Sequence, residues 1–172
     1  PHLVTAACSF VLIAIIGIDT SVNQGVFDCF KLETREGTVV DPYFPAPVNT
    51  YNPALHAIIE SIFAAFGESA PQFARADGGG GRAMTLAHFV DRKTLIQYEL
   101  FAGGVGAMQG YDGENGCHCN QTNGKVTSIE MLETEFPIRA EEFKVLKNSG
   151  GKGKFRGGCG FVRTYRILDG VT

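Results

Sequence analysis

The sequence predicts an α+β fold, in which an N-terminal buried helix and an amphipathic helix pack on a mixed, mainly antiparallel sheet with long glycine-rich loops. An uncharged apolar run over residues 3–18 predicts the first helix. Apolar residues at three- and four-residue spacing over residues 52–67 predict the second helix. Alternating apolar and polar residues predict strands at 84–101, 142–146 and 161–168, with glycine clusters between them.

Length and composition favour one hydrophobic core. The chain has 172 residues, of which 44% are hydrophobic, and we expect one domain or part of one. Its net charge of -3 argues against nucleic acid and other polyanions as partners. Residues 3–18 are too short and too interrupted for a spanning helix, which needs ~20 apolar residues, and no basic leader precedes them, so we expect no membrane segment.

The cysteines bear on the compartment of the protein, and the first residue bears on whether the chain is part of a longer one. Five cysteines are an odd number, and none stands in the C-x-x-C spacing of a structural zinc site, which fits reduced thiols in a cytoplasmic protein. The chain begins at a proline without a polar lead-in. We therefore expect it to be the interior or C-terminal portion of a longer protein.

The first half of the chain contains turn and helix signals in a clear order. We expect a turn at residues 22–25, a strand at 27–32 and a hairpin turn at 36–38. Three prolines keep residues 41–47 extended and outside a central sheet. Asn52 is expected to cap the amphipathic helix, with Pro53 in its first turn and Gly67 at its end. His56 and Glu60 are interpreted as an exposed pair on its polar edge.

Residues 148–160 are the most unusual segment, because they hold six glycines and three cations. A solvated hairpin turn and a loop shaped for contact with a ligand or another chain are both open. A phosphate-binding loop is excluded, since neither Lys152 nor Lys154 is followed by Ser or Thr and no helix pattern follows. The single Arg156-Gly157-Gly158 triplet also lacks the repeats of single-strand nucleic-acid binders.

A second glycine cluster, residues 103–107, resembles a dinucleotide fingerprint but lacks its third glycine, and Asp112 follows too closely to be the ribose carboxylate. A structural turn and a close approach to a ligand or another chain are again both open. The cluster Cys117-His118-Cys119 could hold a soft metal, but adjacent strand residues point to opposite faces, so only the two cysteines would share one. The four histidines show no ligand spacing, so we assign no metal to this chain.

Six clusters, taken in order, resemble the hydantoinase B family, whose relatives include the C-terminal half of 5-oxoprolinase and the large subunits of ketone carboxylases. The clusters begin beyond residue 16. They are Asn23-Gln24-Gly25, residues 45–48, residues 103–107, Asp112-Gly113, Asn123 with residues 128–133, and residues 148–151 through Arg156-Gly157-Gly158.

The resemblance implies an ATP-dependent enzyme subunit with a small-molecule substrate, in which ATP activates a cyclic amide of the hydantoin, 5-oxoproline or other lactam type for hydrolysis through a phosphorylated intermediate. It implies a hetero-oligomer, with ATP and Mg²⁺ on a hydantoinase A-like ATP-binding subunit and a divalent metal in an upstream segment that is absent from this chain. Acetone or acetophenone carboxylation, and a non-catalytic scaffold that docks the ATP-binding subunit, remain alternatives. An independent small-molecule binding domain is a third.

The expected substrate contacts follow from the same clusters. A phosphorylated intermediate needs backbone donors and cations, which the glycine clusters with Lys152, Lys154 and Arg156 could supply. We expect replacement of Gly104 or Arg156 to slow turnover without unfolding the protein. Asn123 and Glu130 could instead cap turns at the edge of the core. The assigned substrate-binding residues are Gly103, Gly104, Gly106, Asp112, Asn123, Glu130 and Arg156.

Overall fold

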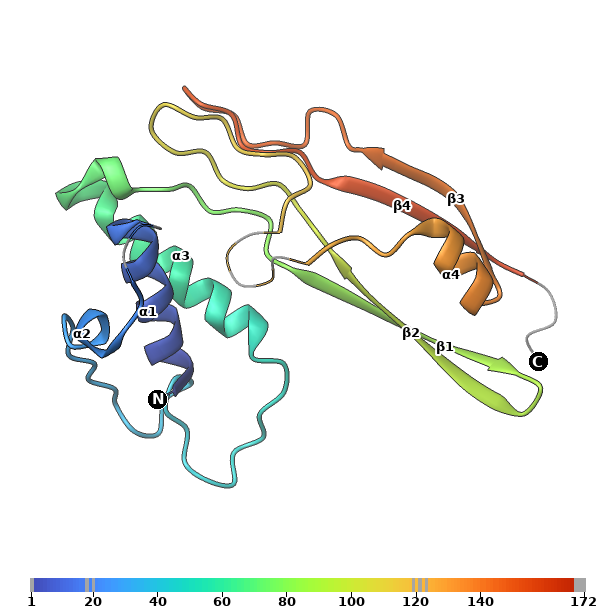
Figure 1. Ribbon diagram of the computed structural model, residues 1–172, viewed down its shortest axis with the longest axis horizontal. Helices are drawn as coiled ribbons and strands as arrows, with labels where there is room; N and C mark the ends of the chain where they lie inside the picture. The colour runs from blue at the N-terminus through green and yellow to red at the C-terminus, as the bar shows by residue number, and fades with distance from the viewer. Residues whose placement is uncertain are drawn as a thin grey trace. The chain divides into compact units, whose positions relative to one another are not determined.

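Helices and two antiparallel strand pairs make up the chain, which confirms the α+β class (Figure 1). The computed structural model describes residues 2–17, 19, 21–118, 120, 122 and 124–168. The chain divides into two compact units, Pro1–Asp77 and Gly78–Thr172. Among the described residues, no helix combines the length and apolar character needed to cross a membrane.

The first unit is helical. It contains α1 (His2–Ile16), α2 (Gln24–Phe27), α3 (Asn52–Ser69) and the 3₁₀ turn η1 (Pro71–Phe73). Its core lies between α1 and α3, where Ala7 and Val11 meet Ile59 and Phe63. α1 is buried along one stripe rather than on all sides, because α3 covers only one of its faces. Gly17 ends α1 with a positive φ of 98°.

Three predictions of secondary structure in this unit are wrong: the strand at residues 27–32, the Asn52 cap and the helix end at Gly67. Residues 27–32 form no strand, because the Asn23 side chain accepts a hydrogen bond from Gly25 N at 2.9 Å and starts the helical turn α2 instead. Helix α3 does not stop at Gly67 but continues to Ser69, and the preceding Tyr51 occupies the N-cap position without a side-chain bond. Pro53 lies in the first turn, as predicted.

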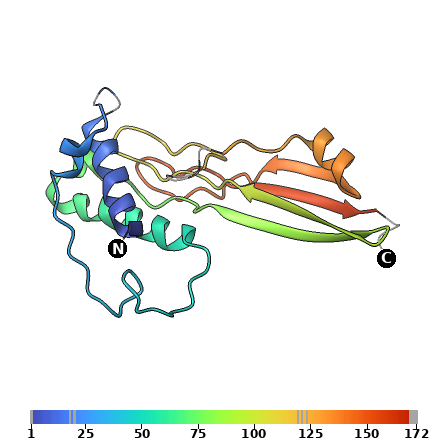
Figure 2. The ribbon, with the colours of Figure 1, turned by 60° about the horizontal axis from the view of Figure 1, so that its bottom comes forward.

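The second unit is built from two strand pairs. β1 (Arg82–Val90) pairs with β2 (Lys93–Phe101), and β3 (Ile138–Val145) pairs with β4 (Phe161–Ile167), both antiparallel as predicted. The pairs are separate two-stranded sheets rather than one mixed sheet. Figure 2 shows them lying alongside each other. The short helix α4 (Ile129–Glu135) contacts β3 and is capped by the Ser128 side chain, which accepts from Met131 N.

A chain of buried polar side chains connects the two sheets of this unit. His88 Nε2 lies 2.9 Å from Gln97 Oε1, and Gln97 Nε2 donates to Glu99 Oε1. The other Glu99 oxygen accepts from Arg163 Nη1 and from the Tyr165 hydroxyl, the latter at 2.8 Å. Glu99 lies on β2 and its two partners lie on β4, so this carboxylate joins the sheets.

Apolar groups surround these hydrogen-bonded polar side chains. The Arg163 guanidinium lies over the rings of Phe101 and Phe143, at 5.0 and 4.6 Å from their centroids. Burial, together with the hydrogen bond to Glu99, raises the pKa of Tyr165 to about 12. The Tyr165 hydroxyl therefore keeps its proton to a higher pH than an exposed tyrosine does.

Candidate functional site: a basic pocket beside the glycine segments

Four glycine-containing segments of the second unit are joined by their backbones, and we call this arrangement the glycine interlock. It comprises Gly79, residues 103–106, residues 112–116 and residues 150–160. Its backbone hydrogen bonds run from Gly79 N to Gly104 O, Val105 N to Glu114 O, Gly113 N to Arg156 O, Gly158 N to Val105 O and Gly116 N to Cys159 O, at 2.7 to 3.1 Å.

The interlock explains why glycine occupies two of its central positions. A Cβ atom at Gly104 would overlap the carbonyl oxygen of Gly158, and a Cβ atom at Gly158 would overlap the carbonyl oxygen of Glu114. The backbones approach too closely for any side chain. Replacement of Gly104 is therefore expected to disturb the fold, contrary to the expectation from the sequence.

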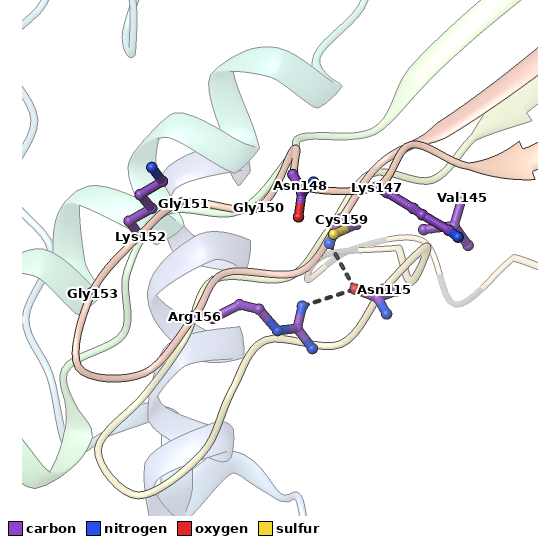
Figure 3. Close-up of a pocket in the computed structure, with 10 residues that line it drawn as sticks. All are labelled: Asn115, Val145, Lys147, Asn148, Gly150, Gly151, Lys152, Gly153, Arg156 and Cys159. Carbon is purple, nitrogen blue, oxygen red and sulfur yellow. Dashed lines mark hydrogen bonds between the residues drawn. The ribbon is translucent and has the colours of Figure 1, made fainter.

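A pocket of about 530 Å³ opens at the last of these segments (Figure 3). Three of the residues around it carry cations: Lys147, Lys152 and Arg156. The complete lining is Asn115, Val145, Lys147, Asn148, Gly150, Gly151, Lys152, Gly153, Arg156 and Cys159. The pocket is thus basic, and glycine backbone forms much of one wall.

Arg156 is held in the pocket by two neighbouring side chains. Its backbone N–H donates to Asp112 Oδ1 at 2.8 Å, and its Nε lies 3.7 Å from Asp112 Oδ2. Its Nη1 donates to Asn115 Oδ1 at 3.1 Å, and the same oxygen accepts from Cys159 N at 2.7 Å. Figure 3 shows the Arg156 and Asn115 side chains pointing toward each other. Two side chains from residues 112–116 therefore position the guanidinium.

The Cys159 thiol also lines the pocket. Hydrogen bonds from the backbone of Gly150 first, then those of Ser149 and the positive charge of Arg156, lower the pKa of this thiol. This thiol therefore loses its proton more readily than a free thiol, because the N–H donors and the guanidinium stabilise negative charge. An anionic group such as a phosphate or carboxylate suits a pocket of this character.

The structure brings several of the predicted site residues together. Gly103, Gly104, Asp112 and Arg156 all belong to the interlock, and Gly106, at the end of the same segment, is buried. Arg156 lines the pocket, as does Lys152, whereas Lys154 is outside its lining and lies over the Phe155 ring at 5.7 Å. Contact of any of these residues with a substrate stays a prediction.

Two predicted residues are not part of this group. Glu130 is an exposed residue in the first turn of α4 and does not line the pocket. Asn123 lies outside the described residues, as does Cys119 of the cysteine–histidine cluster.

Sequence reasoning assigned no role to three lining residues, Asn115, Lys147 and Cys159. Asn115 lies more than 40 residues from the groups that it binds, Arg156 and Cys159. No local pattern marks such a contact. The many glycines in both segments are the one feature of the sequence that indicates such contacts, because they allow the backbone to approach other atoms closely.

The pair His56 and Glu60 in the first unit also differs from its prediction. The Glu60 side chain is only 8% exposed and that of His56 only 14%, so the interpretation as an exposed pair is wrong. The reason is Arg75, whose guanidinium lies 4.4 Å from the Phe63 ring centroid and whose Nη2 donates to Glu60 Oε1 at 2.8 Å. The Asp77 carboxylate approaches the other side of His56, at 3.2 Å from Nε2.

Fold and site together define an α+β protein with a basic pocket. The chain belongs to the Hydantoinase B/oxoprolinase family, whose pattern matches residues 1–172, and this confirms the resemblance seen in the sequence.

Three relatives illustrate this membership. The chain is similar to an uncharacterised protein of Methanocaldococcus jannaschii (35% identity, 95% of this chain, 29% of the relative). It is similar to 5-oxoprolinase of Dictyostelium discoideum (32% identity, 97% of this chain, 13% of the relative). It is also similar to the B-type subunit of a putative D-/L-hydantoinase from a Pseudomonas species (24% identity, 85% of this chain, 25% of the relative). The chain therefore spans less than a third of the length of each.

Proposed function

We propose that this chain is part of the B-type subunit of an ATP-dependent enzyme that hydrolyses a cyclic amide, such as 5-oxoproline, a hydantoin or another lactam. Family membership supports the class of enzyme, and the names of two relatives, a 5-oxoprolinase and a hydantoinase, support the class of substrate. The observation that carries the proposal is the basic pocket, in which Asp112 and Asn115 hold Arg156 in place.

The pocket would act on the activated form of the substrate. Phosphorylation of the amide oxygen converts a poor leaving group into a good one, and the phosphorylated species carries negative charge that ordered cations and N–H donors stabilise. Arg156 offers a positioned guanidinium, and Lys147 and Lys152 add charge nearby. A hydantoinase A-like partner subunit would supply the bound ATP and Mg²⁺, and an upstream segment outside this chain would supply the divalent metal.

The test uses the full-length subunit with its ATP-binding partner. ATP hydrolysis is measured with 5-oxoproline, with hydantoin, and with acetone plus bicarbonate, in the wild type and in Arg156→Gln. The substitution keeps the backbone hydrogen bond to Asp112 but removes the charge, and we expect turnover to fall by about 10²-fold, the effect of losing one positioned donor. Lys154→Gln is the matched control, because this cation of the same loop lies outside the pocket lining.

Equal turnover in the two variants would refute the role of Arg156. Turnover that depends on acetone and bicarbonate, without activity on either cyclic amide, would replace the proposed reaction by ketone carboxylation. Circular dichroism of both variants checks that the fold is retained.

A further inference from the structure

We infer that His56, Glu60 and Asp77 bind a divalent transition-metal ion. One ligand atom from each of the three side chains can be chosen so that all three atoms lie within 4.8 Å of one another. The site lies entirely within the first unit. It is separate from the basic pocket, and the proposed function does not depend on it.

The backbone places these ligands in a pattern suited to chelation. His56 and Glu60 are four residues apart on α3, so their side chains leave the same face of the helix one turn apart. The same spacing brings two ligands to one metal in helical zinc motifs. Asp77 approaches from the segment after η1, and its Oδ1 lies 3.2 Å from His56 Nε2. Neighbouring ligands about 2.1 Å from a shared ion stand at nearly this separation.

Arg75 has the position of a group that orients a metal ligand. Its guanidinium is fixed against the Phe63 ring at 4.4 Å and donates to Glu60 Oε1 at 2.8 Å. Ligating carboxylates are commonly held by such a second hydrogen bond, which fixes their direction. Two carboxylates outnumber this one guanidinium, so negative charge remains to attract a cation.

The donor set selects the class of ion. An imidazole with two carboxylates suits Zn²⁺, Co²⁺, Mn²⁺ or Fe²⁺, because these ions accept nitrogen and oxygen ligands together. Mg²⁺ and Ca²⁺ prefer oxygen ligands alone and are disfavoured by His56. Three protein ligands would leave further coordination positions for water. Such an ion would crosslink α3 to the segment that follows η1.

Titration of the purified protein with Co²⁺ tests the inference. Co²⁺ is the probe because thiolate ligands give a separate charge-transfer absorption, which distinguishes binding by the five cysteines from binding by nitrogen and oxygen. We expect one equivalent bound with a nitrogen and oxygen spectrum, and a rise in melting temperature with Co²⁺ concentration.

Asp77→Asn and His56→Gln are the informative variants. Asp77 is 74% exposed in its side chain, so its substitution should leave the fold intact even if His56→Gln does not. Each should weaken Co²⁺ binding by more than about tenfold, since even the loss of an outer-shell partner has that effect. Glu68→Gln and His2→Gln are controls, because both residues are exposed and lie outside the cluster.

Four results would overturn the inference. The first is the same Co²⁺ affinity in the wild type, Asp77→Asn and His56→Gln. The second is a wild-type spectrum that contains only thiolate coordination, and the third is no bound Co²⁺ at millimolar concentration. The fourth is binding of Mg²⁺ in place of Co²⁺, which would contradict the assigned class of ion.

Discussion

Replacing Glu99 by glutamine is expected to destabilise the second unit strongly. The Glu99 carboxylate receives hydrogen bonds from Gln97, Arg163 and Tyr165, and only 2% of its side chain is exposed. Its charge is the counter-ion of Arg163, which is 8% exposed. Glutamine has nearly the same shape but is neutral, so the variant leaves a buried guanidinium without a negative partner.

The size of the effect follows from that burial. Removing one partner of a buried ion pair costs about 3–5 kcal/mol, whereas an exposed pair contributes about 0–1 kcal/mol. A domain of this kind is stable by about 5–15 kcal/mol, so the loss is a large part of the total. The Glu99→Leu and Arg163→Met double variant should recover part of the loss, because no buried charge remains. Recovery should be incomplete, since Gln97 and Tyr165 still lose their acceptor.

The assay must report on the second unit alone. The chain contains no tryptophan, so far-ultraviolet circular dichroism with urea gives the overall transition, and amide exchange in β2 and β4 gives the local one. Lys144→Gln, which breaks the exposed pair with Glu142, is the control and should change stability by less than about 1 kcal/mol. A Glu99→Gln variant as stable as this control would refute the reasoning.

The remaining predictions concern the interlock and Tyr165. Gly158→Ala should abolish or greatly reduce folding of the second unit, because its Cβ would overlap the Glu114 backbone. Gly151→Ala should be tolerated, because its Cβ meets no atom within 4 Å. Equal amide-exchange protection of the second unit in the two variants would contradict this prediction. Because burial raises the pKa of Tyr165 from 10 to about 12, its contribution to stability is complete below pH 10 and is lost as the pH rises toward 12. Tyr165→Phe should therefore show a smaller fall in the urea midpoint across that range, and an identical fall would exclude this role.

The sequence predicted elements whose signals are local. The apolar periods of α1 and α3 and the alternation of β1 to β4 each lie within about 20 residues. Predictions of secondary structure fail where a local hydrogen bond favours another conformation. At Asn23, the side chain accepts from Gly25 N and starts a helix just before residues 27–32, where a strand was expected. The density of glycine predicts that the segments around Gly104 and Arg156 approach other backbone closely. It does not predict which of these segments are paired with each other.

Polar side chains that face inward are a second feature that the sequence did not predict. Gln97 and Glu99 stand two residues apart on β2, and Arg163 and Tyr165 stand two apart on β4. Such stripes are typical of a solvent face, and only the pairing of the two stripes reveals that they satisfy each other. His56 and Glu60 were misread for the same reason, because their partners Arg75 and Asp77 lie 15 or more residues further along the chain.

The glycine interlock has a consequence for the order of folding. Each of the two strand pairs joins neighbouring parts of the chain, whereas the Val105 carbonyl must wait for the Gly158 amide, about 50 residues further along, before it is paired. Contacts between such distant positions form slowly, since the intervening chain must first be brought together. During synthesis the backbone near residue 105 therefore stays open until about 50 more residues have emerged. Any shortened version that stops before residue 156 would leave the amide of Gly113 without its acceptor, exposed and prone to pair with other chains.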